Sequence, residues 1–168
     1  SDRSPAGKSG TIRLFTAGET YQATIRSVDD YRNLVGDGRT VGLVLSDVYA
    51  FNPPAVPLVG GLANLSYILN TATAAVLTSV SAVDTDNLNP RLATFTVSGL
   101  SVDPAAYTKL LALIPGEAYT PGKPPYDTGT VGGRTVLQST TVPAGTPLTF
   151  TVRAVDSQWN TVSVNGAV

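Results

Sequence analysis

A segment near the start of the chain reappears, imperfectly, near its end, and this internal repeat limits what the chain can fold into. Residues 17–35 align with residues 144–162 at a constant offset of 127 positions, and eight of the nineteen aligned residues are identical. The identical residues in the first copy are Ala17, Gly18, Thr24, Arg26, Val28, Asp29, Asn33 and Val35. Self-similarity at a fixed offset indicates a chain built from repeated modules. Neither copy holds a group of residues typical of catalysis.

Apolar and polar residues alternate along much of the chain, whereas a sustained helical period is absent. Within the first repeat, Tyr21, Ala23, Ile25 and Ser27 fall on one face of an extended chain. Such alternation is the signature of half-buried strands. It predicts strands at 21–28 and 92–98, and the repeat predicts another at 148–155. The runs 40–45, 61–69 and 74–81 have strand length as well. The run 107–114 could be a strand or a short helix on its pattern alone, and its length and the following Pro115-Gly116 favour a strand. Dense Gly, Pro, Asp and Asn turn signals separate these runs, and this spacing suggests an antiparallel sandwich.

Composition excludes several classes of function. Charged residues make up 14% of the chain and the net charge is −1. The sequence has no cluster of basic residues, which argues against binding of nucleic acid. The chain has no cysteine or histidine, so thiolate metal sites and the commonest general base are missing. No apolar run approaches the roughly 18–20 residues of a membrane span. We expect a non-enzymatic, extracellular or cell-surface protein without a cofactor; lacking an initial methionine, it should be a processed chain or a segment.

The order of motifs along the chain resembles a known family. The repeat reads Ala-Gly, then an alternating strand ending in Arg-x-Val-Asp, then Asn-x-Val. The runs 41–47, 58–67 and 71–78 follow it, and 104–110 leads to Pro115-Gly116. This order is similar to that of bacterial immunoglobulin-like repeats of large surface proteins. The resemblance implies an all-β fold, an antiparallel immunoglobulin-like β-sandwich.

The same resemblance implies one nearly complete module at 1–100 and an incomplete second module at 101–168. In the second module, a Pro/Gly-rich loop at 120–133 is expected between its first two strands. Residues 1–20 contain no counterpart of the opening strand expected at 107–114. An incomplete module exposes a hydrophobic sheet edge and face that must be covered. Either the chain is a fragment of a longer array, or a neighbouring subunit completes it by β-strand complementation.

The function predicted from these observations is structural. We expect a subunit or segment of an extracellular filament, surface layer or adhesin stalk that associates with neighbouring copies of itself. The alternative is a carbohydrate-binding or adhesive module, because exposed aromatic rings stack on sugars and are enriched at interfaces. Trp159 aligns with Arg32, so the fold does not require this ring, and a protein contact is favoured over core packing. The candidate interface residues are Trp159, Tyr126, Tyr119, Tyr107, Leu111 and Leu113.

Clustered carboxylates and amides invite a comparison with calcium sites, because calcium prefers oxygen ligands. Asp29 and Asp156 end the repeated strand in each copy, with an asparagine four residues on; we favour an Asx-type turn there over a metal. Asp84, Asp86 and Asn87 are weak calcium candidates, since the glycine and the downstream glutamate of a calcium loop are missing. For residues 84–89, a hairpin loop between two strands is favoured over a calcium site.

Overall fold

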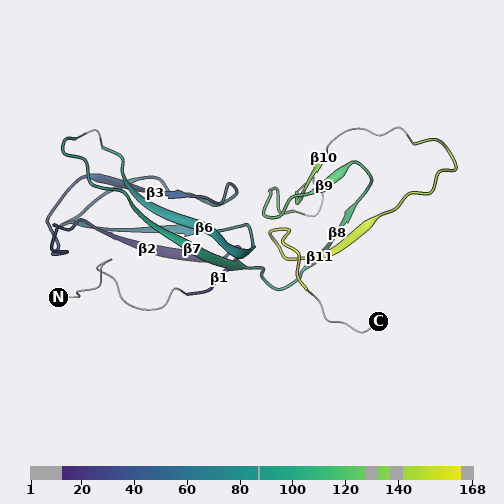
Figure 1. Ribbon diagram of the computed structural model, residues 1–168, viewed down its shortest axis with the longest axis horizontal. Helices are drawn as coiled ribbons and strands as arrows, with labels where there is room; N and C mark the ends of the chain where they lie inside the picture. The colour runs from purple at the N-terminus through teal and green to yellow at the C-terminus, as the bar shows by residue number, and fades with distance from the viewer. Residues whose placement is uncertain (1–12, 87, 128–131, 137–141, 164–168) are drawn as a thin grey trace.

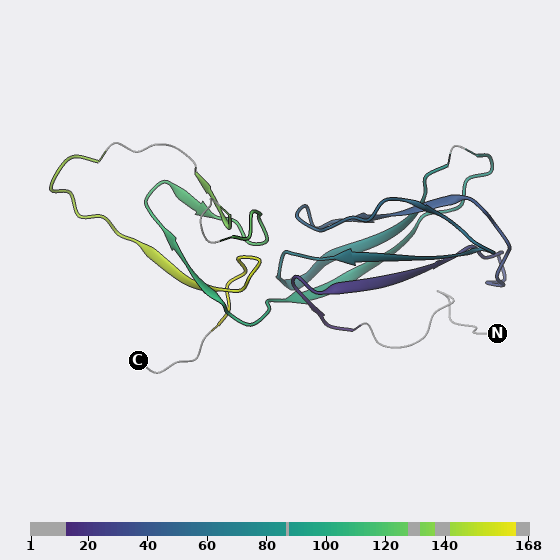
Figure 2. The same ribbon diagram turned by 180° about the vertical axis from the view of Figure 1, so that it is seen from behind.

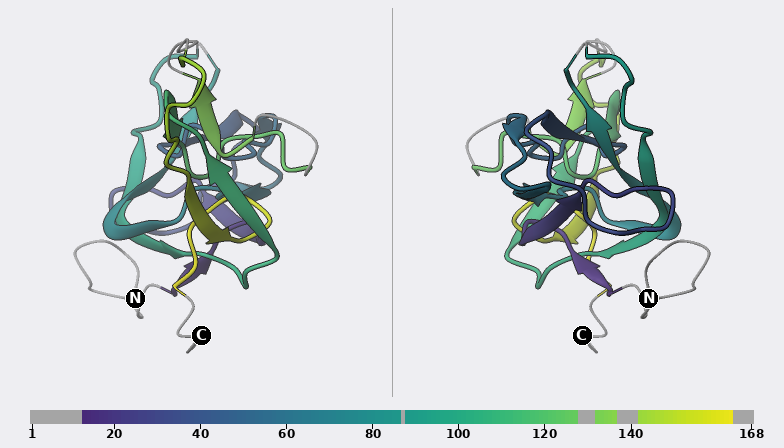
Figure 3. Two further views of the ribbon diagram at one scale, coloured as in Figure 1. Left: turned by 90° about the vertical axis from the view of Figure 1, so that its right-hand side faces the viewer. Right: turned by 90° about the vertical axis from the view of Figure 1, so that its left-hand side faces the viewer.

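The computed structural model describes residues 13–86, 88–127, 132–136 and 142–163, and these residues form eleven strands and no helix. The described chain is therefore all-β, as predicted. Two groups of strands lie one after the other along the long axis of the molecule (Figure 1). We call the group at residues 15–103 the first module and the group at residues 109–155 the second module. Figure 3 views them end-on, one in front of the other.

The first module contains a five-stranded sheet and a two-stranded sheet (Figures 1 and 2). In spatial order, the larger sheet consists of β1 (Phe15–Thr16), β7 (Phe95–Asp103), β6 (Thr73–Asp84), β3 (Thr40–Leu45) and β4 (Val56–Pro57). The smaller sheet pairs β2 (Thr20–Arg26) with β5 (Leu62–Ile68). All pairs are antiparallel except β1 with β7, which is parallel.

The core of the first module lies between these two sheets. The alternation in β5 is regular: Ala63, Leu65 and Tyr67 are buried, whereas Asn64 and Ser66 between them are exposed. The larger sheet contributes the buried residues Leu43, Val80, Leu100 and Val102 to the cluster that contains Leu65 and Tyr67, whereas Ala63 packs in a second cluster with Val41 and Leu58. Removing this apolar surface from water drives the association of the sheets, at roughly 25 cal/mol per Å².

The second module is smaller. β8 (Lys109–Leu113) pairs antiparallel with β11 (Thr151–Val155), and β9 (Glu117–Tyr119) pairs antiparallel with β10 (Arg134–Val136). The β9–β10 pair occupies the insertion that separates the module's first two strands. Part of the expected 120–133 loop, residues 128–131, lies outside the described residues.

Several strands have other bounds than expected. The strand expected at 92–98 is β7, which begins at Phe95 and continues to Asp103, past residue 100. β11 begins at Thr151, three residues later than the strand predicted from Leu148. The last residue of β8, Leu113, lies opposite Thr151. Residues 148–150, which precede Thr151, therefore have no described strand beside them. Without a partner, that stretch of the repeat does not become a strand.

Candidate functional site

The Asp-x-x-x-Asn segment of the first module forms a compact turn after β2. The Asp29 carboxylate accepts hydrogen bonds from the backbone N–H groups of Tyr31 (2.9 Å) and Asn33 (2.8 Å), and from the Asn33 side chain (3.0 Å). Arg32 has a φ of 66°, in the left-handed region. These bonds, chiefly those to Asn33, hold the pKa of the Asp29 carboxyl below its usual value. This is the Asx-type turn favoured from the sequence.

The second copy repeats this geometry closely after β11. The Asp156 carboxylate accepts from the backbone N–H groups of Gln158 (2.9 Å) and Asn160 (2.8 Å), and from the Asn160 side chain (2.9 Å). Trp159, which aligns with Arg32, has a φ of 68°. The repeat in sequence is therefore also a repeat in local structure.

The environments of the two turns differ. The first turn is exposed, whereas Asp156 and Asn160 are 0% and 1% exposed because their turn docks onto the first module. The Asn160 side-chain amide donates to the backbone oxygen of Asn70 (2.9 Å), and its oxygen accepts from the N–H of Ala72 (2.8 Å). One carboxamide thus pairs with the chain between β5 and β6.

Two glycines allow close approach at the same junction. A Cβ on Gly18 would lie 2.5 Å from the Gln158 side chain, and one on Gly122 would lie 2.2 Å from Thr71 Oγ1. Within the second module, the N–H of Gly122 donates to the backbone oxygen of Gln158 (3.0 Å), which holds these two contact residues together. The two modules are therefore joined by a close-packed contact as well as by the covalent chain.

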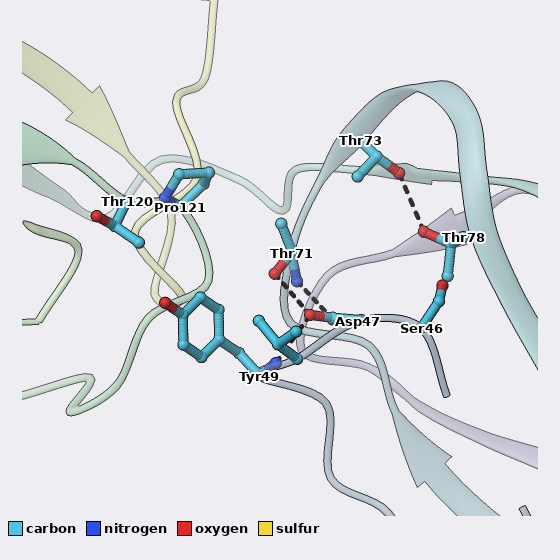
Figure 4. Close-up of a pocket in the computed structure, with 9 residues that line it drawn as sticks. Ser46, Asp47, Tyr49, Thr71, Thr73, Thr78, Thr120 and Pro121 are labelled. Atoms are coloured by element: carbon cyan, nitrogen blue, oxygen red, sulfur yellow. Dashed lines mark hydrogen bonds between the residues drawn. The ribbon is translucent and has the colours of Figure 1, made fainter. Parts of the chain in front are cut away.

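Beside this junction lies a small cavity of about 320 Å³ lined by both modules (Figure 4). Its only charged group is Asp47, whose two carboxylate oxygens accept bonds from Tyr49, Asn70 and Thr71. Because these bonds occupy the carboxylate, the aspartate braces the loop between β5 and β6. Its role here is structural.

Several predicted interface residues form the core of the second module instead. Trp159, Leu111 and Leu113 are 3%, 4% and 7% exposed and pack around Val155. The Trp159 indole N–H donates to the oxygen of Pro125 (2.7 Å). The preference for an exposed Trp159 is corrected: the insertion around β9 and β10, which the first module lacks, covers this ring.

The two tyrosines near Trp159 are half-buried. The Tyr119 hydroxyl donates to the backbone oxygen of Trp159 (2.8 Å), and the Tyr126 hydroxyl donates to that of Gly122 (2.8 Å). Burial, with the nearby Asp47 charge adding to it, raises the pKa of Tyr126 to about 12. Trp159, Tyr119 and Tyr126 therefore form no open platform for a sugar. Tyr107, by contrast, is 62% exposed.

A lysine contributes its charge to this core. The Lys109 ammonium lies 3.4 Å from the centre of the Trp159 ring and donates to the backbone oxygens of Tyr126 (2.6 Å) and Ser157 (2.9 Å). Burial lowers the pKa of Lys109, because it disfavours the charged form. The cation–π contact and the two carbonyl oxygens offset part of that cost.

The calcium candidates are occupied by other bonds. Asp84 accepts from the N–H groups of Leu92 (2.9 Å) and Asp86 (2.9 Å), and Asp86 accepts from that of Thr40 (2.6 Å). The Leu92 N–H is the largest cause of the lowered pKa of Asp84. Asn87 lies outside the described residues. Within the described ranges, no group of three or more carboxylates, histidines or cysteines could hold a metal.

The second module also carries an exposed apolar surface, which we name the open face. It consists of alternate residues of β8, β11 and the stretches beside them: Leu110, Ala112, Ile114, Leu148, Phe150 and Val152. Four of its side chains, Leu110, Leu148, Phe150 and Val152, are 71%, 45%, 56% and 60% exposed. None of the six is charged. Exposed apolar side chains that gather on one strand pair, rather than occurring singly, are typical of interaction sites.

Comparison with known protein families, curated proteins and solved structures finds no match for this chain. In the part of the chain that the structure describes, no helix has the length and apolar character needed to cross a bilayer.

Proposed function

We propose that this chain is a structural building block of an extracellular filament, surface layer or adhesin stalk. It consists of one immunoglobulin-like β-sandwich module and part of a second. It associates with neighbouring copies by β-strand complementation. A neighbouring copy supplies the strands that the second module lacks, and these strands cover its exposed apolar face.

The strand order supports the immunoglobulin-like assignment of the first module. Strands β2 and β5 pair in one sheet, while β3, β6 and β7 pair in the other. In an immunoglobulin-like sandwich the second and fifth strands likewise face the third, sixth and seventh. The internal repeat then identifies β11 as the second strand of the next module.

The open face is the observation that carries the proposal. Its residues Leu148, Phe150 and Val152 align with Tyr21, Ala23 and Ile25 of the first repeat. Those three residues belong to the first module's core or pack against it. The same positions that face a second sheet in one module therefore face solvent in the other. Burying a large apolar side chain stabilises a structure by about 1.5–3 kcal/mol, so this face favours association.

The edge of β11 supports strand addition as well. The N–H of Val162 donates to the oxygen of Ala154 (2.9 Å), just as the N–H of Val35 donates to the oxygen of Ser27 (2.9 Å). In the first module, the N–H of Ser27 lies on the same edge of β2 and donates to the backbone oxygen of Gly61 (2.9 Å), the residue before β5. The edge of β11 that carries Ala154 therefore corresponds to the edge of β2 that pairs with β5.

The opposite edge of β11 carries β8. The N–H of Thr108 donates to the oxygen of Val155 (2.9 Å), one residue along from Ala154, and adjacent strand residues direct their backbone groups to opposite edges. Among the described residues, no strand occupies the edge of β11 that corresponds to the β5 position. An unpaired edge of this kind can accept a strand from a neighbour.

Self-association tests the proposal. Sedimentation velocity and electron microscopy should show concentration-dependent oligomers of the unaltered chain, and Val152→Asp should reduce association at least tenfold by placing a charge on the open face. Val59→Asp is the matched control, because Val59 is an exposed valine (78%) of the first module, outside the open face. Exclusively monomeric chain at high concentration, or equal effects of the two substitutions, would contradict the proposal.

A further inference from the structure

The turn after β2 has the internal geometry of the docked turn, but its asparagine side chain has no partner outside the turn among the described residues. The Asn33 side-chain amide donates to Asp29 (3.0 Å), as that of Asn160 donates to Asp156 (2.9 Å). In Asn160 the second amide proton and the oxygen bind the first module. In Asn33 the corresponding proton and oxygen bind no other group of the described chain. The carboxamide is thus held ready to bind one acceptor and one donor.

We propose that the Asp29–Asn33 turn is a docking site for another β-module. It would bind the turn between that module's fifth and sixth strands, as the Asp156–Asn160 turn binds Asn70 and Ala72. The ligand is then a backbone C=O and a backbone N–H two residues apart. This inference rests on the proposed function, because it names a second contact of the same assembly.

The surroundings of the turn fit a docking surface. Tyr31 is 84% exposed, and Leu34, Val35 and Val28 are 49%, 43% and 39% exposed. Exposed aromatic and aliphatic side chains around a polar pair are typical of interface centres. Tyr31 aligns with Gln158, the side chain that packs on Gly18 at the existing junction.

The existing junction also defines the partner. Within one chain, Asn160 already occupies Asn70 and Ala72, so an intact copy has no free receptor turn. The partner is a module of the same kind whose turn between the fifth and sixth strands is free. The two turns of this chain follow the ends of β2 and β11. Strand β2 runs from the junction toward the far end of the first module (Figure 1), so successive modules would add head-to-tail.

A receptor can be made from this chain by freeing its own turn. Asn160→Leu keeps the side-chain size and removes both hydrogen bonds to the first module. Asn160→Asp is a second receptor that removes the amide donor, in case the leucine variant does not fold. All chains carry Val152→Asp, which suppresses association through the open face. The donor, with Asn160 intact, is titrated with each receptor while its Asn33 side-chain amide signal is followed by NMR.

The receptor variants should bind this donor at least tenfold more tightly than a receptor with Asn160 intact. Binding should move the Asn33 amide signal, and Asn33→Leu in the donor should weaken binding at least tenfold. Asp30→Ser is the matched control on the same turn and should leave binding unchanged. Binding that does not depend on Asn33, or no gain when Asn160 is replaced, would overturn the inference. Neither outcome would affect association through the open face, which the Val152 comparison tests separately.

Discussion

At the scale of single residues, one motif has two energetic roles. Asp29 and Asp156 both organise a turn by accepting backbone N–H bonds, and this role needs no neighbour. Asn160 adds a second role, because its side chain is buried and satisfies a C=O and an N–H of the other module. A buried polar group that loses its partner costs more than an exposed one, since water cannot replace the lost bond.

Asn160→Ala should therefore lower the free energy of unfolding by about 1–3 kcal/mol, because it leaves the oxygen of Asn70 and the N–H of Ala72 without a partner. Asn33→Ala is the matched control, with the same change in the equivalent, exposed turn of the first module. Its effect should stay within about 0.5 kcal/mol, as for most exposed positions. Urea denaturation followed by Trp159 fluorescence measures both. Equal losses would show that the contact between modules contributes nothing.

Acid should act through the carboxylates that accept backbone bonds. The folded-state pKa of Asp84 lies below its ordinary value of 3.8, mainly because of the Leu92 N–H. Its contribution to stability is therefore present above pH 3.8 and is lost as the pH falls through the folded-state pKa. Asp84→Asn should give a shallower decline in the urea midpoint between neutral and acidic pH than the unaltered chain. A variant with the same acid dependence would argue against this assignment.

At the scale of strands, alternation in the sequence predicts the longer elements well. The range 61–69 contains β5, which has one buried and one exposed face. The range 40–45 coincides with β3, which is an apolar run with three consecutive buried residues rather than an alternating one. The strands β1 and β4 have two residues each, too few for a period to be recognised. Alternation alone does not predict the exposed face of β11, because it does not show whether a second sheet covers a strand; the expectation of an exposed face comes from the incomplete set of motifs in the second module.

The site could be predicted only in part. The Asx-type turns follow from the Asp-x-x-x-Asn spacing, and the repeat identifies them twice. Burial of Trp159 does not follow, because the fold of the first repeat offers arginine at that position and no covering layer. The layer comes from the Pro/Gly-rich loop and the strands β9 and β10 on either side of it, which have three residues each, too few for alternation to be recognised. Contacts made by such irregular segments depend on tertiary packing.

The insertion should respond to alkaline pH through Tyr126. Its folded-state pKa is raised to about 12 from an ordinary value of 10, chiefly by burial. A raised pKa stabilises the fold below pH 10, and that stabilisation is lost as the pH rises from 10 toward 12. Tyr126→Phe should reduce the loss of stability across this window, measured by urea denaturation at fixed pH values. An identical alkaline decline in the variant would exclude Tyr126 as a source.

At the scale of the whole molecule, polar uncharged contacts and apolar burial dominate over ion pairs. Only 14% of the residues are charged, and ion pairs within the described part of the chain include those of Arg39 and Arg134. The junction between modules is made of amide, backbone and glycine contacts. The open face likewise carries no charge, so any association through it should have the thermodynamics of apolar burial rather than of charge attraction.

Temperature and salt distinguish these two sources of association. Hydrophobic stabilisation weakens on cooling, whereas attraction between exposed charges is screened by salt, with a Debye length of about 10 Å at 0.1 M. Association of the unaltered chain should therefore weaken when it is cooled from room temperature toward freezing. It should persist when the salt concentration is raised tenfold. Sedimentation velocity on the unaltered chain and on Phe150→Asp measures both dependences, and the substitution should abolish the cold sensitivity together with the association. Oligomers that dissociate in salt but resist cooling would mean that charged surfaces elsewhere hold the copies together, because uncharged side chains such as Leu110 and Phe150 cannot produce that response.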